Sequence, residues 1–281
     1  MLFLGVDGGG TGCRAAVADA AGRVLGRGTA GPANIASDPE GARASILRAA
    51  RAALAEAGLD EDELPGLRAG LGLAGVNGKG FAERLRAALP FARLRIETDA
   101  VTAVKGAMGP GDGVVAALGT GSVFAVQRGG RVRQIGGWGL VLGDEGSGAW
   151  IGRAILSRAL RAQDGFVPLT PFLRRLLEER GGADGVVTFS LGARPADFAA
   201  LAPLVAASDD PAAQAVMERA AQDVAEAVDL LRGGENLPVV LLGGLAPVHA
   251  ARLAGRWDLR EPLGTALDGA LWLAREGAVE P

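Results

Sequence analysis

A glycine-rich loop lies close to the N-terminus, where Asp7-Gly8-Gly9-Gly10-Thr11-Gly12 ends the apolar run of residues 2–7. Adjacent glycines let backbone amides point at one ligand and let that ligand approach closely, which suits phosphate oxygens. Thr11 adds a hydroxyl donor, and Asp7, at the end of a strand, could hold Mg²⁺ directly or through water. The loop indicates a phosphate site, although this loop alone is equally compatible with a plain tight turn.

Two further glycine loops occupy comparable places later in the chain. Gly119-Thr120-Gly121-Ser122 also carries hydroxyls between two expected strands, so the two loops could grip the phosphates of a nucleotide from opposite sides of a cleft. Gly243-Gly244 follows a third apolar run and precedes a helix, where a flat adenine could lie on it. By itself, the Gly243-Gly244 pair is typical of a turn.

Two common nucleotide motifs are excluded. The sequence has no Gly-x-x-x-x-Gly-Lys-Ser/Thr, the P-loop pattern. Residues 10–15 match the dinucleotide fingerprint superficially, but a hairpin and not a helix is expected after them.

Composition narrows the chemistry further. The 281 residues contain 29 Lys+Arg and 32 Asp+Glu, a net charge of −3 that disfavours nucleic-acid binding. One His and one Cys exclude multi-histidine metal centres, internal disulfides and cysteine-rich metal sites within the chain. Carboxylates, hydroxyls, backbone amides and arginine remain. Because we find neither a signal peptide nor an apolar run long enough to span a bilayer, we expect a soluble, cytoplasmic protein without membrane contact.

Apolar patterning predicts an α/β protein in which a strand–glycine loop–strand–turn–strand unit occurs twice, which suggests an internal duplication. The expected strands are 2–7, 13–19, 23–28, 67–74, 93–98, 113–118, 123–128, 131–136 and 238–242. The expected helices are one around Ile46–Ala57 and those over 81–89, 100–107, 147–162, 170–180, 195–207, 211–232 and 264–276.

These motifs together resemble the sugar kinase/Hsp70/actin superfamily. Within it, the chain is similar to bacterial N-acetylglucosamine and glucosamine kinases of the BadF/BadG/BcrA/BcrD ATPase group. The resemblance rests on VDGGGTGCRA (6–15), GPANI (31–35), ETDA (97–100), LGTGS (118–122), GGWGLVLGDEGSGAWIG (136–152), AQDG (162–165), LLGGLAP (241–247) and DGALWLA (268–274).

The resemblance implies a two-domain, actin-like ATPase fold of the ribonuclease H-like type, with a duplicated mixed-sheet core and an interdomain cleft. Residues 1–110, completed by the C-terminal helix 264–281, would form one domain and residues 111–263 the other. By analogy with the family we expect a homodimer, which no sequence feature by itself indicates. The ligands implied are ATP, Mg²⁺ and a small amino sugar, phosphorylated on its 6-hydroxyl.

The resemblance also assigns roles to individual residues. Asp99 falls at the position of the family's catalytic base, and an aspartate that merely begins the helix over 100–107 is the alternative; Thr98 could cap that helix instead. The residues expected at the sugar are Asn34, Asp99, Gly121, Trp138 and Asp144. The residues expected at the nucleotide are Asp7, Gly8, Gly9, Gly10, Thr11, Gly119, Thr120, Gly121, Gly243 and Gly244, with Asp7 at the metal.

Plainer structural roles are open to several of these residues and to their neighbours. Trp138 could belong to the core, and Asp144 or Ser147 could cap the following helix. Glu145 could act on the metal or on the position of its loop. We expect His249 at the surface or at the edge of the nucleotide and Cys13 as a small buried hydrophobic residue.

Three other functions compete with an amino-sugar kinase. One is a kinase for another hexose such as glucose. The second is the ATPase activator of a 2-hydroxyacyl-CoA dehydratase, which needs cysteine ligands for an iron–sulfur cluster, and Cys13 is the only cysteine in the sequence. A sugar-sensing repressor would need a DNA-binding segment ahead of the first strand.

Overall fold

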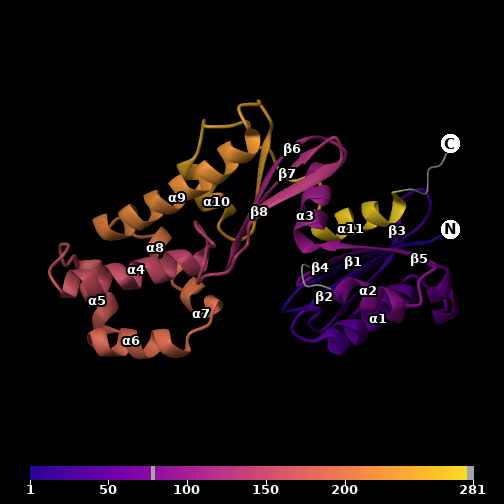
Figure 1. Cartoon of the computed structure of the whole chain (residues 1–281), viewed down its shortest axis with the longest axis horizontal. Helices are drawn as coiled ribbons and strands as arrows, with labels where there is room; N and C mark the ends of the chain where they lie inside the picture. Colours follow the sequence, from indigo (N-terminus) through magenta and orange to yellow (C-terminus); the bar gives the residue numbers. More distant parts are fainter. Residues whose placement is uncertain (77–79, 277–281) are drawn as a thin grey trace. The chain divides into compact units, whose positions relative to one another are not determined.

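A computed structural model describes residues 1–76 and 80–276, which fall into two compact units (Figure 1). Unit 1 comprises Met1–Asp112, Gln127–Val132 and the chain from Glu261 onward, and unit 2 comprises Gly113–Val126 and Arg133–Arg260. Residues 277–281 of the expected closing segment lie outside the described residues. Among the described helices, none combines the length and the apolar character that crossing a membrane requires.

Unit 1 is built on a mixed sheet in the order β3-β2-β1-β4-β5. The first three strands are antiparallel, as the expected hairpins require, whereas β1, β4 and β5 run parallel. The carboxyl ends of the three parallel strands therefore meet at one edge of the sheet. The strands are β1 Phe3–Gly8, β2 Cys13–Ala18, β3 Val24–Ala30, β4 Arg68–Leu73 and β5 Arg93–Thr98.

Helices cover both faces of this sheet (Figure 1). Alternate residues of β1 divide between the faces, because Leu4 and Val6 pack with Ile46 of α1, whereas Phe3 packs with Leu271 of α11. The helices of unit 1 are α1 Pro39–Glu56, the 3₁₀-helix η1 Glu61–Gly66, α2 Phe81–Ala88, α3 Asp99–Met108 and α11 Ala266–Arg275.

Unit 2 repeats this plan with the sheet order β8-β7-β6-β9, in which β6 and β9 are parallel. One continuous apolar core joins this sheet to the long helices α4 and α9. The strands are β6 Gly113–Leu118, β7 Ser122–Arg128, β8 Arg131–Gly136 and β9 Val239–Leu242; the helices are α4 Gly148–Gln163, α5 Pro171–Glu178, α6 Gly182–Gly192, α7 Pro195–Ala199, α8 Ala202–Ala206, α9 Pro211–Arg232 and α10 Ala246–Arg252.

The α/β class and the repeated strand unit are confirmed, and most expected elements agree to within a few residues at their ends. The prediction of one helix over 195–207 is wrong, because α7 ends at Ala199 and α8 begins at Ala202. Pro203 lies in the first turn of α8 and has no N–H to continue an earlier helix. Helix α6 was not predicted, because Gly181-Gly182 is typical of a turn; in the structure Gly181 is its left-handed N-cap.

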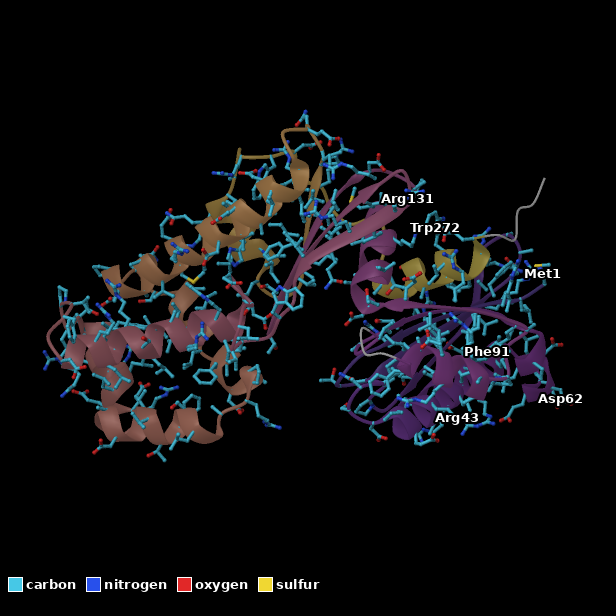
Figure 2. The ribbon with its side chains drawn as sticks, viewed as in Figure 1. Met1, Arg43, Asp62, Phe91, Arg131 and Trp272 are labelled. Atoms are coloured by element: carbon cyan, nitrogen blue, oxygen red, sulfur yellow. The ribbon has the colours of Figure 1, made fainter. Side chains whose placement is uncertain are left out.

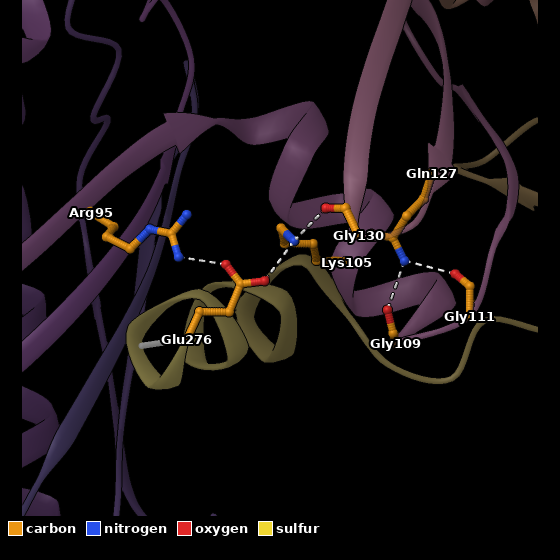
Figure 3. A network of polar contacts seen from close by, with 7 residues as sticks. All are labelled: Arg95, Lys105, Gly109, Gly111, Gln127, Gly130 and Glu276. Atoms are coloured by element: carbon orange, nitrogen blue, oxygen red, sulfur yellow. Dashed lines mark hydrogen bonds and ion pairs between the residues drawn. The ribbon is translucent and has the colours of Figure 1, made fainter. Parts of the chain in front are cut away.

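The turn between β7 and β8 belongs to unit 1 and takes part in a polar network within that unit (Figure 3). Nε2 of Gln127 donates to the carbonyl oxygens of Gly109 and Gly111, at 2.8 and 2.7 Å. The buried ammonium of Lys105 lies 3.0 Å from the Glu276 carboxylate and 4.1 Å from the centre of the Trp272 ring. This buried cation is thus paired on two sides, which offsets the cost of its desolvation.

Helices α3 and α11 touch backbone to backbone. A Cβ added at Gly106 of α3 would lie 1.9 Å from the carbonyl oxygen of Thr265, and one added at Gly269 of α11 would lie 1.9 Å from that of Thr102. Only glycine permits this approach.

We therefore expect Gly106→Ala to lower the free energy of unfolding of the protein by about 1–3 kcal/mol, the usual cost of overpacking. Thermal unfolding followed by circular dichroism measures this loss. Gly66→Ala serves as the control, because a Cβ there meets nothing within 4 Å, and it should change stability by less than about 0.5 kcal/mol. An unchanged midpoint for Gly106→Ala would contradict the close helix contact.

Candidate active site

The first glycine loop closes the end of β1 in unit 1. Its backbone is fixed by hydrogen bonds from Ala74 N to Gly8 O and from Ala33 N to Gly9 O, both 2.9 Å. Cβ atoms added at Gly9 or Gly10 would meet nothing within 4 Å, so the loop faces open space. A phosphate can therefore approach these amides without a side chain in the way.

A polar cavity of about 440 Å³ adjoins this loop within unit 1. Asp7 and Thr11 line it, together with Arg14 and Thr29, which sequence reasoning did not single out. Arg14 lies directly opposite Asp7 in the β1–β2 register, and its guanidinium forms an ion pair with the Asp7 carboxylate at 2.5 Å. The predicted hairpin, with its pairing worked out, could have identified Arg14.

The residues at this cavity suit a magnesium ion that is held mainly by the phosphates of a bound substrate and only in part by the protein. Asp7 supplies one carboxylate at this cavity, and the described part of the chain contains no cluster of three or more His, Cys, Asp or Glu side chains that could hold a metal. Mg²⁺ keeps several waters and commonly takes one or two protein carboxylates plus substrate phosphates. A site that depends on bound phosphates fits this donor set.

Asn34 lies beside the ends of β1 and β4. Its side-chain oxygen accepts hydrogen bonds from Ala36 N at 3.0 Å and Ser37 N at 3.3 Å, and Ile35 N donates to Ala74 O. These bonds use the amide oxygen to shape the loop, which leaves the amide NH₂ as the group available to a ligand.

Asp99 follows β5 at the same edge of the sheet. Gly8, Leu73 and Thr98 are aligned across β1, β4 and β5, and because neighbouring strands are about 4.8 Å apart, the ends of β1 and β5 are about 10 Å apart. Thr98 is the N-cap of α3 and accepts from Val101 N, so Asp99 is not needed as the cap.

The Asp99 side chain is exposed to solvent. Desolvation by neighbouring protein atoms raises the pKa of Asp99, and the negative charge of Asp7 adds to the rise; the hydrogen bond from Ala100 N opposes it. A carboxylate with a raised pKa at the edge of a phosphate loop is suited to accept a proton.

The two glycine loops of unit 2 also lie side by side at the end of parallel strands. Leu245 N donates to Leu118 O at 3.0 Å, and a Cβ at Gly243 would lie 2.4 Å from that same oxygen. The carbonyls of Gly119 and Thr120 accept from the first amides of α4, which fixes the loop against the helix. Gly244 and Gly119 face open space.

Asp144 lies against the glycine loop over residues 119–122 in an unusual backbone conformation. It is the one described non-glycine residue with positive φ, at 61°, and its side chain is buried. Its Oδ1 accepts from Gly139 N at 3.2 Å, and its Oδ2 occupies the space that a Cβ on Gly121 would need. Burial raises the pKa of Asp144, and hydrogen bonds from the backbone amides of Gly139 and Ser122 oppose the rise. Ser147, not Asp144, caps α4.

Trp138 is 74% exposed, so the alternative of a core tryptophan is wrong. It adjoins an apolar cavity of about 650 Å³ that includes Leu140 and Phe198, and a second cavity of about 400 Å³ that includes Glu145. An exposed indole beside a polar loop offers a flat apolar face to a ligand.

The predicted role of Cys13 is confirmed and that of His249 is wrong. Cys13 is buried, and desolvation raises the pKa of its thiol to about 12. His249 is fully buried and its Nε2 lies 2.9 Å from the carbonyl oxygen of Gly146, so the expected surface position is wrong. The sequence around His249 could not predict this contact, because Gly146 is 103 residues away along the chain.

The predicted site residues thus form two groups, one in each unit. Unit 1 brings together Asp7, Gly8, Gly9, Gly10, Thr11, Asn34 and Asp99; unit 2 brings together Gly119, Thr120, Gly121, Asp144, Gly243 and Gly244, with Trp138 on the adjoining loop.

The conformation of Asp144 leads to a prediction about stability. We expect Asp144→Asn to raise the free energy of unfolding at pH 7, because Asn tolerates positive φ and removes a carboxylate whose charged form is disfavoured by burial. We expect Asp144→Ala to lower it by about 1–3 kcal/mol, through backbone strain and a lost hydrogen bond.

The pH dependence of the stability of Asp144→Asn tests whether removal of the buried charge causes the gain in stability. Because the folded-state pKa of Asp144 is raised, the advantage of Asp144→Asn is full above that pKa and disappears as the pH falls below the ordinary value of 3.8. Thermal unfolding between pH 3 and 8 measures it. A stability gain that is the same at every pH would show that burial of the charge is not its cause.

Comparisons with known proteins agree with this geometry. The BadF/BadG/BcrA/BcrD ATPase family model matches residues 4–257. The glucosamine kinase GspK of Vibrio cholerae serotype O1 is 32% identical and covers 97% of this chain and 95% of its own. A crystal structure from Chromobacterium violaceum, provisionally assigned as an N-acetylglucosamine kinase, is 35% identical with a TM-score of 0.86, over 97% of this chain and 98% of that one.

A more distant structure shows how widely the fold is shared. Component A of the (R)-2-hydroxyglutaryl-CoA dehydratase of Acidaminococcus fermentans is 14% identical with a TM-score of 0.50 and covers 99% and 100% of the two chains, a likeness of fold alone. The two mixed sheets are those of the actin-like ATPase and sugar kinase folds. The family match over residues 4–257 and the 32% identity to a relative over nearly the whole chain show that this chain belongs to the BadF/BadG/BcrA/BcrD ATPase family.

Proposed function

We propose that this protein is an ATP-dependent amino-sugar kinase that transfers the γ-phosphoryl group to the 6-hydroxyl of N-acetylglucosamine or glucosamine. The observation that carries the proposal is the placement of the Asp99 carboxylate at the same sheet edge as the loop over residues 8–12. Relatives of the whole chain that are named as glucosamine and N-acetylglucosamine kinases support it.

Asp99 is proposed as the general base. As the sugar hydroxyl attacks phosphorus, its proton passes to the Asp99 carboxylate, while the bond between the γ-phosphorus and the bridging oxygen of ADP breaks. The raised pKa of Asp99 favours this transfer, since a base with a higher pKa binds the proton more strongly.

The glycine loops would hold ATP. Amides of Gly8, Gly9 and Gly10 and the Thr11 hydroxyl are proposed donors to the phosphates, as are Gly119, Thr120 and Gly121. Gly243 and Gly244 would lie against the adenosine. Bound Mg²⁺ would neutralise charge on the phosphates, and Asp7 is the protein carboxylate that would hold it.

Four residues are proposed to bind the sugar besides Asp99. The NH₂ of Asn34 and the carboxylate of Asp144 suit sugar hydroxyls, and Gly121 leaves room for Asp144 beside the second loop. The exposed indole of Trp138 would cover an apolar face of the sugar or an N-acetyl methyl.

The competing functions differ in what they require. A kinase for another hexose would use the same base and loops and would differ in its sugar preference. An iron–sulfur activator needs reactive cysteine ligands, whereas Cys13 is buried with a pKa of about 12, which disfavours that function.

The domain limits, the oligomeric state and the cellular location are proposed by analogy with the family. We propose that two domains, with limits near 1–110 plus 264–281 and near 111–263, act together on the two substrates, and that the enzyme is a cytoplasmic homodimer. Size-exclusion chromatography with light scattering tests the oligomeric state.

Replacing the base is the most direct test of the mechanism. We expect Asp99→Asn to lower kcat by at least about 10²-fold, because Asn keeps the shape of the side chain but cannot accept the proton. Sugar affinity measured by calorimetry should remain largely unchanged.

Asp62→Asn is the matched control, because Asp62 is an exposed acid of η1, which precedes β4 and so lies at the opposite end of the parallel strands (Figure 2). It should turn over at the wild-type rate. Near-normal turnover by Asp99→Asn would contradict the assignment of the base.

A substrate panel tests the substrate class. ADP release in a coupled assay is measured with N-acetylglucosamine, glucosamine, N-acetylmannosamine and glucose. We expect one of the first two to give the highest kcat/KM. A clear preference for glucose would favour the hexose kinase instead.

A further inference from the structure

His249 lies in the second turn of α10, the short helix that follows the Gly243-Gly244 loop. Its side chain is fully buried, and Nε2 lies 2.9 Å from the carbonyl oxygen of Gly146, which is 103 residues away in the sequence. Gly146 stands two residues after Asp144. The His249 side chain, on the helix that follows the Gly243-Gly244 loop, therefore contacts the loop that carries Asp144, the carboxylate proposed to bind the sugar.

The contact fixes the chemical state of the ring. A carbonyl oxygen only accepts hydrogen bonds, so Nε2 must carry the hydrogen. Nδ1 is buried and has no partner among the described residues, so a second hydrogen there would be unsatisfied. Burial lowers the pKa of His249, and the nearby positive charge of Arg252 lowers it further, while the bond to Gly146 opposes this. The ring is a neutral donor.

One backbone hydrogen bond and one side-chain hydrogen bond complete a closed set of contacts among three loops of unit 2, those over residues 118–122, 139–147 and 243–245. Leu245 N donates to Leu118 O, and Ser122 Oγ donates to Glu145 O at 2.8 Å. The loop over residues 118–122 is therefore bonded both to the loop that contains Gly243-Gly244 and to the loop that contains Asp144. The bond from His249 to Gly146 links the Asp144 loop to α10, the helix that follows Gly243-Gly244.

The restraint acts where the backbone is under strain. Asp144 has a φ of 61°, which is unfavourable for a residue with a side chain and persists only where the surroundings hold it. A Cβ at Gly146 would lie 2.5 Å from Val224, so α9 closes the other side of this loop. The loop is thus confined between α9 and His249.

We infer that His249 is a positioning residue: its hydrogen bond to Gly146 holds the Asp144 loop in its sugar-binding conformation and couples that loop to the nucleotide loop ahead of α10. The inference rests on the proposed function. If the two loops are coupled, each ligand must raise the affinity of the other by the same factor.

Two variants of His249 separate the hydrogen bond from the space the ring fills. Gln and Met have nearly the same length and shape, but only Gln can donate to the Gly146 carbonyl. Calorimetry measures the Kd of the preferred amino sugar with and without a non-hydrolysable ATP analogue. In the wild type we expect the analogue to tighten sugar binding by a factor within the usual range of about 5–150.

We expect His249→Gln to keep this coupling and His249→Met to lose it, with the sugar Kd and the sugar KM about tenfold higher. Leu253→Ala is the matched control, because Leu253 is a buried core residue at the end of α10 with no bond to the Asp144 loop. It should lower the melting temperature and leave the coupling intact. Coupling retained by His249→Met, lost equally by both His249 variants, or absent from the wild type would overturn the inference.

A spectroscopic measurement applies even if a variant fails to fold. The sequence has one histidine, so ¹⁵N-labelled histidine gives the ring signals of His249 alone in the wild-type protein. We expect the Nε2–H tautomer, no protonation near the ordinary pKa of 6.5, and a shift of the ring signals when either ligand binds. The Nδ1–H tautomer, or signals unmoved by both ligands, would overturn the inference. A wild-type enzyme that phosphorylates no amino sugar would contradict the proposed function instead, while the ring signals with nucleotide alone would still test the link.

Discussion

Parallel strand pairing determines where the functional groups of this protein can lie. In unit 1 the register aligns Gly8, Leu73 and Thr98 across β1, β4 and β5, so the residues that follow these strands emerge at one edge. In unit 2 the pairing of β6 with β9 does the same for the two glycine loops that follow them. The hairpins on the other side of each sheet add the partner strands, and their first turns are the glycine loops that follow β1 and β6.

Close packing keeps these edges in place. Glycines allow α11 to contact both β1 and α3 directly, and in unit 2 the glycine after β9 allows that loop to contact Leu118 O. Some of the glycines therefore allow close contacts between backbone segments, and others leave backbone amides open to a ligand. Asp144 adopts a strained backbone conformation with positive φ, and a hydrogen bond from Gly139 N to its side chain helps to hold it there.

The sequence predicted the strands, the hairpins and the duplicated plan, because apolar alternation and glycine turns are local signals. The N-caps Thr98 and Ser147 were among the alternatives it left open. Long-range contacts could not be read in this way. The partnership of Arg14 with Asp7 needed the strand register, and the burial of His249 depends on a carbonyl oxygen 103 residues away. Helix α6 was missed because its first residues are glycines, which locally favour a turn.

In the proposed reaction, the γ-phosphoryl group of ATP moves to the 6-hydroxyl of an amino sugar. Identification of the product by ³¹P–¹H correlation NMR tests it most directly, because coupling of phosphorus to the sugar protons reports the atom that carries the phosphate. We expect one phosphate monoester, whose phosphorus is coupled to the two protons on carbon 6, formed in step with ADP. Phosphate on another oxygen of the sugar, or inorganic phosphate with unmodified sugar, would contradict it.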